Sequence, residues 1–217
     1  MKTTSYQSGL TYEKYDRDHL AIYFNETEKE LPAEQGQQAQ KVYEYDTVLV
    51  EGETPSAEAF IAALVANGIA LLDAQAISAG IIFAAIKKGQ LEGDALAAAK
   101  AMVTAQISVY DASPAVNEFT YQGTVMWLDK DTRAGLMLRL NAEQAAGHET
   151  TTLWYGTTAF TLSVADAMQM LGALELYASA SFDCTEQHKA NVAALTTVKK
   201  VESYDYTKGY PPKLVFE

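Results

Sequence analysis

The chain has a single cysteine, three histidines and little positive charge, and each scarcity excludes a class of protein. Cys184 alone cannot form an intramolecular disulfide, which favours synthesis in a reducing compartment. Sixteen Lys and Arg residues against 28 Asp and Glu residues leave a formal net charge of −12. A surface of this sign repels phosphate backbones and anionic lipid headgroups, so we expect neither nucleic acid nor a membrane as partner.

Long uninterrupted apolar runs and targeting signals are also missing. Segment 57–86 is very apolar, but Asn67, Asp73 and Gly80 interrupt it before it reaches the ~20 residues of a membrane span. Alanine-rich helices buried in a bundle explain this segment better. No apolar stretch follows Lys2 near the start, so we expect no secretory signal.

Motifs for phosphate binding and nucleophilic catalysis are absent from the sequence. There is no G-x-G-x-x-G, G-x-x-x-x-G-K or G-x-S-x-G. Cys184 and His188 lie four residues apart on a predicted helix, a spacing that suits two metal ligands, but zinc needs three or four. His188 also falls on an apolar stripe, which favours a buried, hydrogen-bonded histidine. We therefore expect a non-enzymatic protein with no metal and no cofactor.

The run Asp129-Lys130-Asp131 admits two interpretations. Two carboxylates could form an acid/base pair or bind a metal. A helix is predicted to start at the same point, and aspartates in a first turn accept backbone N–H bonds and suit the helix dipole. We favour capping for that reason.

The first half of the chain predicts a hairpin followed by helices. Residues 1–18 are polar and rich in tyrosine, and we expect a mobile or partner-dependent arm. Runs 20–24 and 42–50 are rich in β-forming residues and flank a turn-forming segment, which predicts a β-hairpin that must pack on something. The predicted alanine-rich helices span residues 55–66, 69–88 and 94–110.

The second half of the chain has a different organisation. Asp111-Ala112-Ser113-Pro114 breaks the third helix and marks a boundary. Beyond it, turns at Gln122-Gly123 and Gly156-Thr157 predict two short hairpins that alternate with helices, the longest over 164–195 and a short one over 198–203. Ser163 followed by Asp166 resembles a capping box at the start of the longest helix. The fold class is therefore α+β: an N-terminal β-hairpin and Ala-rich helices, followed by a β-β-α-β-β-α domain with one long C-terminal helix. The expected domains are 1–52 (an arm and hairpin for docking), 53–110 (Ala-rich helical) and 113–217 (α+β).

Aromatic residues supply the candidate contacts. Trp127, Trp154, Tyr155 and Phe160 cluster on the two short hairpins, where they could hold a sugar or a partner peptide. A core face packed on the long helix is the more common role, and we favour it. Tyrosines number 13 and gather at both ends of the chain, which suits an assembly role. The possible partner or ligand contacts are Tyr23, Tyr43, Tyr45, Trp127, Trp154 and Tyr155.

Several blocks of the second half carry a family resemblance. They are Val116-Asn117-Glu118-Phe119-Thr120, Met126-Trp127-Leu128-Asp129, Asp131-Thr132-Arg133, Thr152-Leu153-Trp154-Tyr155, Ala194-Leu195-Thr196-Thr197, Tyr204-Asp205-Tyr206 and Gly209-Tyr210-Pro211. In order and spacing they resemble a domain-of-unknown-function family of bacteriophage and prophage tail and tail-fibre-associated proteins of Bacteroidales type. The resemblance covers about residues 113–214, and the alanine-rich segment 57–105 departs from it.

The resemblance implies a virion context and supplies no catalytic residues. It implies a structural or adaptor protein of the tail, baseplate or tail-fibre region that assembles with other virion proteins. Such a protein would be made in the cytoplasm of a bacterial host and would act as a homo-oligomer or as part of a ring or fibre. A receptor- or glycan-binding module of a tail fibre and a tail-fibre assembly chaperone are the alternatives. A cell-wall or capsule hydrolase is disfavoured because no acid/base pair is recognisable.

Overall fold

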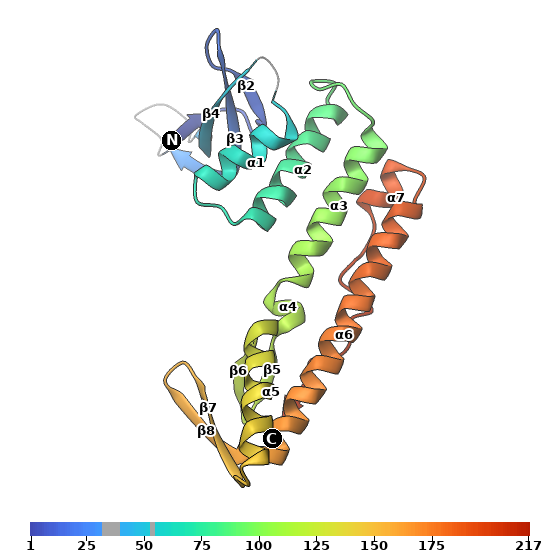
Figure 1. Cartoon of the computed structure of the whole chain (residues 1–217). Helices are drawn as coiled ribbons and strands as arrows, with labels where there is room; N and C mark the ends of the chain where they lie inside the picture. The colour runs from blue at the N-terminus through green and yellow to red at the C-terminus, as the bar shows by residue number, and fades with distance from the viewer. Residues whose placement is uncertain (32–39, 53–54) are drawn as a thin grey trace. The chain divides into compact units, whose positions relative to one another are not determined.

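The computed structural model describes residues 1–31, 40–52 and 55–217, and it has the expected α+β fold, with helices and several small sheets (Figure 1). Its residues fall into two compact units, 1–106 with 194–204 and 107–193 with 205–217. Each unit has its own buried apolar cluster.

The first unit contains a four-stranded antiparallel sheet in the order β1-β4-β3-β2. Its centre is the predicted hairpin, formed by β3 (His19–Leu31) and β4 (Gln40–Glu51). The hairpin prediction is confirmed, and both strands are longer than the apolar runs that signalled them. The turn expected between the two strands lies mostly at residues 32–39, outside the described residues.

The expectation of a mobile N-terminal arm is wrong. β1 (Lys2–Ser5) pairs with Tyr43–Asp46 of β4, and β2 (Tyr12–Lys14) pairs with Leu20–Ile22 of β3. Both are short edge strands with mainly polar side chains, which discourage the unpaired edge of a sheet from pairing with another chain. Polar composition therefore gave no sign of the pairing.

Both faces of the sheet are covered near the start of β3. Ile22 and Phe24 point to one face and pack against Phe60 and Leu64. Successive side chains of a strand point to opposite faces, so Tyr23 lies on the other face, in a second cluster with Ala21 and Tyr45. Residues Leu20 to Phe24 are consequently all buried, although the sheet is antiparallel.

The helices of the first unit confirm the predicted ones to within two residues at every end. They are α1 (Ala57–Ala66), α2 (Leu71–Lys87), α3 (Ala95–Asp111), whose last turn belongs to the second unit, and α7 (Val198–Glu202). Ser56 caps α1, with its Oγ accepting from the Ala59 N–H at 3.2 Å. Gly68, with a φ of +84°, follows the helix end, a conformation that glycine adopts readily.

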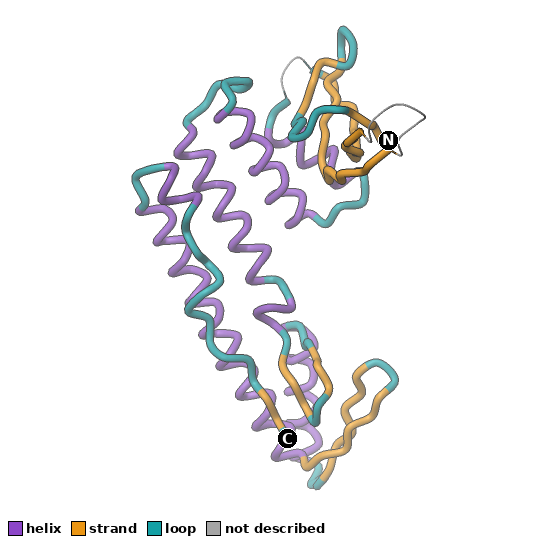
Figure 2. Tube along the Cα trace, turned by 180° about the vertical axis from the view of Figure 1, so that it is seen from behind, coloured by secondary structure: helices purple, strands orange, loops and turns teal. Residues whose placement is uncertain are grey.

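The second unit has the predicted β-β-α-β-β-α order. Its elements are α4 (Pro114–Asn117), β5 (Phe119–Tyr121), β6 (Thr124–Met126), α5 (Lys130–Ala145), β7 (Thr150–Tyr155), β8 (Thr158–Ser163), α6 (Val164–Ala194) and β9 (Val215–Phe216). β5 and β6 turn at Gln122 and Gly123, whose φ angles are 47° and 76°. β9 was not predicted; it pairs in parallel with β5. β7 and β8 form a separate two-stranded sheet (Figure 2).

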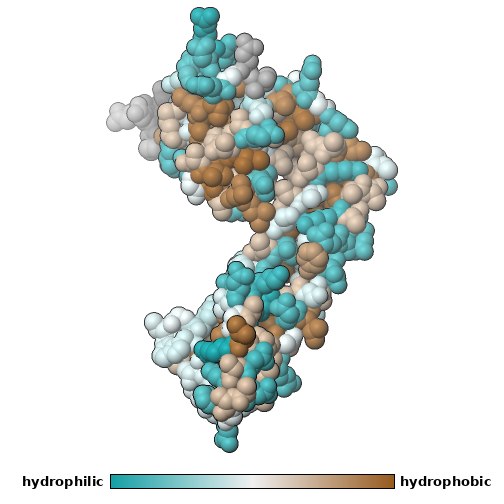
Figure 3. Space-filling model, in the orientation of Figure 1, coloured by the Kyte–Doolittle hydropathy of each residue, from teal (hydrophilic) through white to brown (hydrophobic). Residues whose placement is uncertain are grey.

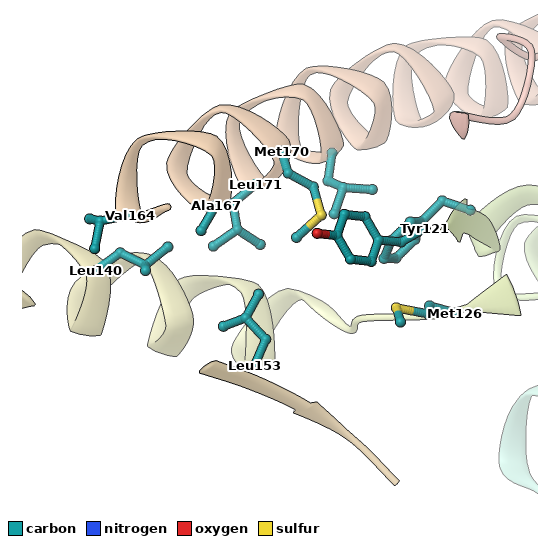
Figure 4. Packing of buried hydrophobic residues seen from close by; sticks show 10 residues of the cluster. Tyr121, Met126, Leu140, Leu153, Val164, Ala167, Met170 and Leu171 are labelled. Carbon is teal, nitrogen blue, oxygen red and sulfur yellow. The ribbon is translucent and has the colours of Figure 1, made fainter. Parts of the chain in front are cut away.

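One face of α6 supplies much of the core of the second unit. Val164, Ala167, Met170 and Leu171 point from the helix toward side chains of α5 and the strands (Figure 4). The residues they meet are Phe119, Tyr121, Met126, Leu140 and Leu153. A two-stranded hairpin is marginal in water on its own, so β7 and β8 depend on this packing.

Both predicted helix caps of the second unit are confirmed. Asp129 Oδ1 accepts from the Thr132 N–H at 2.7 Å at the start of α5, and this bond contributes to a lowered pKa of the Asp129 carboxyl. At the start of α6, Ser163 Oγ accepts from the Asp166 N–H at 3.0 Å and donates to Asp166 Oδ2 at 2.7 Å. Capping therefore explains Asp129 without an acid/base role.

Replacing Leu140 with alanine should lower the free energy of unfolding of the second unit by about 2–5 kcal/mol. Leu140 is fully buried at 0% exposure, so the change leaves a cavity in the α5–α6 core. Both tryptophans of the chain lie in the second unit, so urea unfolding followed by tryptophan fluorescence reports on it.

Leu138 is the matched control for that experiment. It lies on the same helix, two residues away, and is 73% exposed. Leu138→Ala should change the unfolding free energy by less than about 0.5 kcal/mol. Equal losses in the two variants would contradict the packing described for α5.

Glu44 of β4 makes the first unit sensitive to acid. It accepts hydrogen bonds from Lys2 and Lys29, each at 2.8 Å, and these bonds lower the pKa of its carboxyl to about 2. A lowered folded-state pKa contributes stability that is complete above the ordinary pKa of about 4.5 and is lost as the pH falls toward 2. Glu44→Gln should therefore lower the thermal midpoint near neutral pH, and the difference from the wild type should shrink below about pH 4.

Circular dichroism melts across this pH range measure the effect. Glu92→Gln is the control, because Glu92 is exposed and has no hydrogen-bond partner within the described residues. A gap between Glu44→Gln and wild type that stays constant down to about pH 2 would contradict the assignment.

Candidate functional site

The β7–β8 hairpin displays Trp154 on the outside of the second unit. Trp154 is 68% exposed, whereas its neighbour Leu153 is 8% exposed and packs in the core. The alternation of side chains along a strand places the two on opposite faces. The expectation that the aromatic cluster forms the core face is confirmed for Phe160, which packs against the core, and is wrong for Trp154.

The face around Trp154 is uncharged. Trp154 pairs across the hairpin with Ala159, and Thr152 pairs with Thr161 in the adjacent position on the same face. All four side chains are exposed. This set, which we call the aromatic face, combines one large flat ring with two hydroxyls.

Two contacts hold the aromatic face on the rest of the unit. Arg139 of α5 donates from Nη2 to Thr151 Oγ1 at 2.9 Å and to the Thr152 carbonyl at 3.0 Å. Tyr155, which is half-buried, accepts a hydrogen bond on its OH from the Trp127 N–H at 3.2 Å. Trp127, directly after β6, is 38% exposed. The hairpin is therefore tied to both α5 and β6.

The tyrosines proposed as contacts in the first unit lie mainly inside it. Tyr23 and Tyr45 are 3% and 1% exposed, and their rings meet edge to face with centroids 5.5 Å apart. Tyr45 donates to Glu26 Oε2 at 2.8 Å, and Tyr23 donates to Glu13. Burial is the main cause of the raised pKa of both phenols. Tyr43 is half-buried, so it alone of the three retains a substantial exposed surface.

Cys184 and His188 bind the C-terminal loop of the chain. His188 is 9% exposed, and its Nε2 lies 2.8 Å from the Lys208 carbonyl oxygen. Its ring stacks on Tyr210 with centroids 5.7 Å apart, which confirms the preferred interpretation of a buried, hydrogen-bonded histidine. Burial and the nearby Asp111 raise the pKa of the Cys184 thiol, which reduces its thiolate fraction at neutral pH.

Thr185 completes this anchorage. Its Oγ1 donates to Asp111 Oδ1 at 2.7 Å and accepts from the Tyr210 hydroxyl at 2.8 Å. Tyr110 contacts the rings of Tyr206 and Tyr210 edge to face. Figure 2 shows the loop running along α6, so these C-terminal tyrosines pack within their own unit.

The described residues contain no group of three or more His, Cys, Asp or Glu side chains placed to hold a metal ion. Among them, no helix is both long and apolar enough to cross a membrane. Comparison with protein-family models, curated proteins and solved structures finds no match.

Further apolar side chains are exposed on both units. In the space-filling view, apolar surface gathers over α1 and α2, where Val65 and Leu71 are 42% and 58% exposed (Figure 3). On the second unit, Leu138 and Leu176 are 73% and 76% exposed. Single exposed apolar residues are common on protein surfaces. The aromatic face differs from them in its large aromatic ring and in the hydrogen bonds of Arg139 and Tyr155 that hold its hairpin in place.

Replacing Thr185 with valine should lower the unfolding free energy of the second unit by about 1–3 kcal/mol. Valine keeps the shape of threonine but leaves Asp111 and Tyr210 without their shared partner. Tryptophan fluorescence during urea unfolding measures the loss. Thr158→Val on the exposed part of β8 is the control and should be nearly neutral. A neutral Thr185→Val would show that the hydrogen bonds do not anchor the loop.

Proposed function

We propose that this chain is a non-enzymatic structural adaptor of a bacteriophage tail, baseplate or tail-fibre region and acts by protein–protein assembly. The proposal rests on one observation. Trp154 is exposed on a hairpin that Arg139 and Tyr155 hold against the rest of the unit. The virion context comes from the sequence resemblance over residues 113–214. Other virion proteins, or further copies of the chain, are the partners in this proposal.

Trp154 has the properties of an interface anchor. Tryptophan is enriched among the residues that contribute most to binding, because a partner can remove a large apolar area from water. The side chain of Trp154 is 68% exposed, so that area is available in the free chain. Arg139 and Tyr155 hold the surrounding backbone, which reduces the entropy lost when a partner binds.

A receptor- or glycan-binding module is the second candidate, supported by the chemistry of the aromatic face. An aromatic ring can stack on the apolar C–H face of a sugar, and hydroxyls beside it can bond the sugar oxygens. Trp154, Thr152 and Thr161 supply these groups on one uncharged surface. The same surface would then contact a neutral saccharide in place of a protein.

Replacing Trp154 with alanine should reduce the copies of the chain bound per purified particle by at least about tenfold. The loss of an exposed ring should leave the melting temperature nearly unchanged. Quantitative mass spectrometry of particles assembled with tagged wild-type or variant chain measures the copy number. Leu176→Ala, which removes a 76% exposed apolar side chain from α6, is the control and should retain normal incorporation.

The same variants separate the two candidates. Normal incorporation of Trp154→Ala, together with lost binding on a glycan array, would replace the adaptor role with the glycan-binding one. Absence of the wild-type chain from purified particles would contradict the adaptor role directly.

A further inference from the structure

The outer edge of β8 is a free sheet edge. Among the described residues β8 pairs only with β7. The Val164 N–H donates to the Glu149 carbonyl at 3.0 Å, which makes these two a hydrogen-bonded pair of the ladder. Bonded and non-bonded pairs alternate along an antiparallel ladder, so the N–H and C=O groups of Ala159 and Thr161 point away from β7. Their backbone groups have no hydrogen-bond partner in the part of the chain that the structure describes.

The outer edge of β7, by contrast, is partly covered. Arg139 of α5 donates to the Thr152 carbonyl at 3.0 Å, and by the same alternation this carbonyl points away from β8. The Arg139 side chain thus occupies a position where a further strand would pair with β7. No such contact covers β8 within the described residues, and Ala159 and Thr161 are exposed. Figures 1 and 2 show the turn end of the hairpin away from α6.

β8 also lacks the features that normally keep a sheet edge from pairing with another chain. Proteins protect exposed edges with charged side chains, prolines, bulges or very short strands. The edge strands β1 and β2 have four and three residues and carry Lys2, Glu13 and Lys14. β8 has six residues with no charge and no proline, and it pairs with β7 without a register shift. An unprotected edge of this kind is a template for another strand.

A second copy of the chain supplies a strand that matches this edge. Two antiparallel β8 strands related by a two-fold axis at Phe160 set Ala159 of each copy opposite Thr161 of the other. Each outward N–H of one copy then meets an outward C=O of its partner, so the edge is complementary to itself. The Phe160 residues of the two copies lie opposite each other, and aromatic pairs across strands are favourable.

The charges near β8 do not oppose this pairing. The strand itself carries none, although the whole chain has a net charge of −12. Asp166 and Glu217 line an open pocket of about 510 Å³ together with Thr161 and Leu162 of β8. Because the strands are antiparallel, these two acids of one copy and the same acids of the other lie on opposite sides of the two-fold axis.

We propose that two copies of the chain pair through β8 into one antiparallel sheet, in the order β7-β8-β8-β7. Ala159 and Thr161 lie on the same face of the hairpin as Trp154, so the dimer joins two aromatic faces into one uncharged surface. One strand from each copy is a smaller contact than the ~1,600 Å² of a typical stable interface, so the dimer is weak and reversible. The assignment rests on the proposed assembly role and names one partner, a second copy.

Sedimentation equilibrium of the purified full chain tests the assignment. The mean mass should rise with concentration from the 23.6 kDa of one chain toward twice that value. Raising the salt from about 0.05 M to about 0.5 M should strengthen the association, because salt screens the repulsion between two acidic copies. A chain that stays monomeric at about 1 mM would overturn the proposal. Association that weakens in high salt would place charged groups in the contact and would also overturn it.

Proline variants test the edge itself. Thr161→Pro removes an outward N–H of β8 and leaves the bonds to β7 in place. It should weaken dimerisation at least about tenfold, since the dimer loses one hydrogen bond from each copy. Ala159→Pro is the second variant and should act in the same way. Thr150→Pro, which removes an outward N–H from β7, is the matched control and should dimerise like the wild type. Tryptophan fluorescence checks that each variant folds, and wild-type association of folded Thr161→Pro and Ala159→Pro would contradict the assignment.

Isotope-filtered NMR of mixed labelled and unlabelled wild-type chains locates the contact without any substitution. Pairing about Phe160 brings the Hα protons of the two Phe160 residues together, so a nuclear Overhauser effect between the chains is expected there. A dimer whose contacts between chains lie elsewhere, for example at Val65 and Leu71 of the first unit, would overturn the β8 assignment.

These outcomes are distinguishable from a failure of the adaptor role. A monomeric wild-type chain that still enters purified particles would reject the dimer and retain the adaptor role. A chain that dimerises through β8 but is absent from particles would retain the dimer and reject the adaptor role.

Discussion

The second unit depends on the apolar face of α6. Its sheets have two or three short strands, and none could bury an apolar face alone. Val164, Ala167 and Met170 provide the surface on which β5, β6 and the β7–β8 hairpin pack. Because Leu153 and Phe160 are drawn to this surface, the alternation of the strand turns Trp154 outward. The display of the aromatic face is thus a consequence of the same packing that stabilises the fold.

Farther along α6 the apolar pattern gives way to Thr185 and His188, and both are buried. A buried polar side chain needs a partner, and the C-terminal loop supplies it through Lys208 and Tyr210. Thr185 and His188, which interrupt the apolar stripe of α6, therefore mark the place where the C-terminal loop packs on this helix. This packing also explains why Tyr206 and Tyr210 are half-buried, with their rings in contact with Tyr110.

The sequence predicted the elements whose signals are local. Asp129 and Ser163 mark helix starts, and Gln122-Gly123 marks a turn, because each residue acts through its own backbone. β2 pairs with the nearby β3, but its three residues are too few to show an alternating pattern. β1 and β9 escaped prediction because their stability comes from partners distant in the sequence. The same limit applies to the candidate contacts: Tyr23, Tyr45 and Trp154 all occur in strands, and only tertiary packing decides which face is covered.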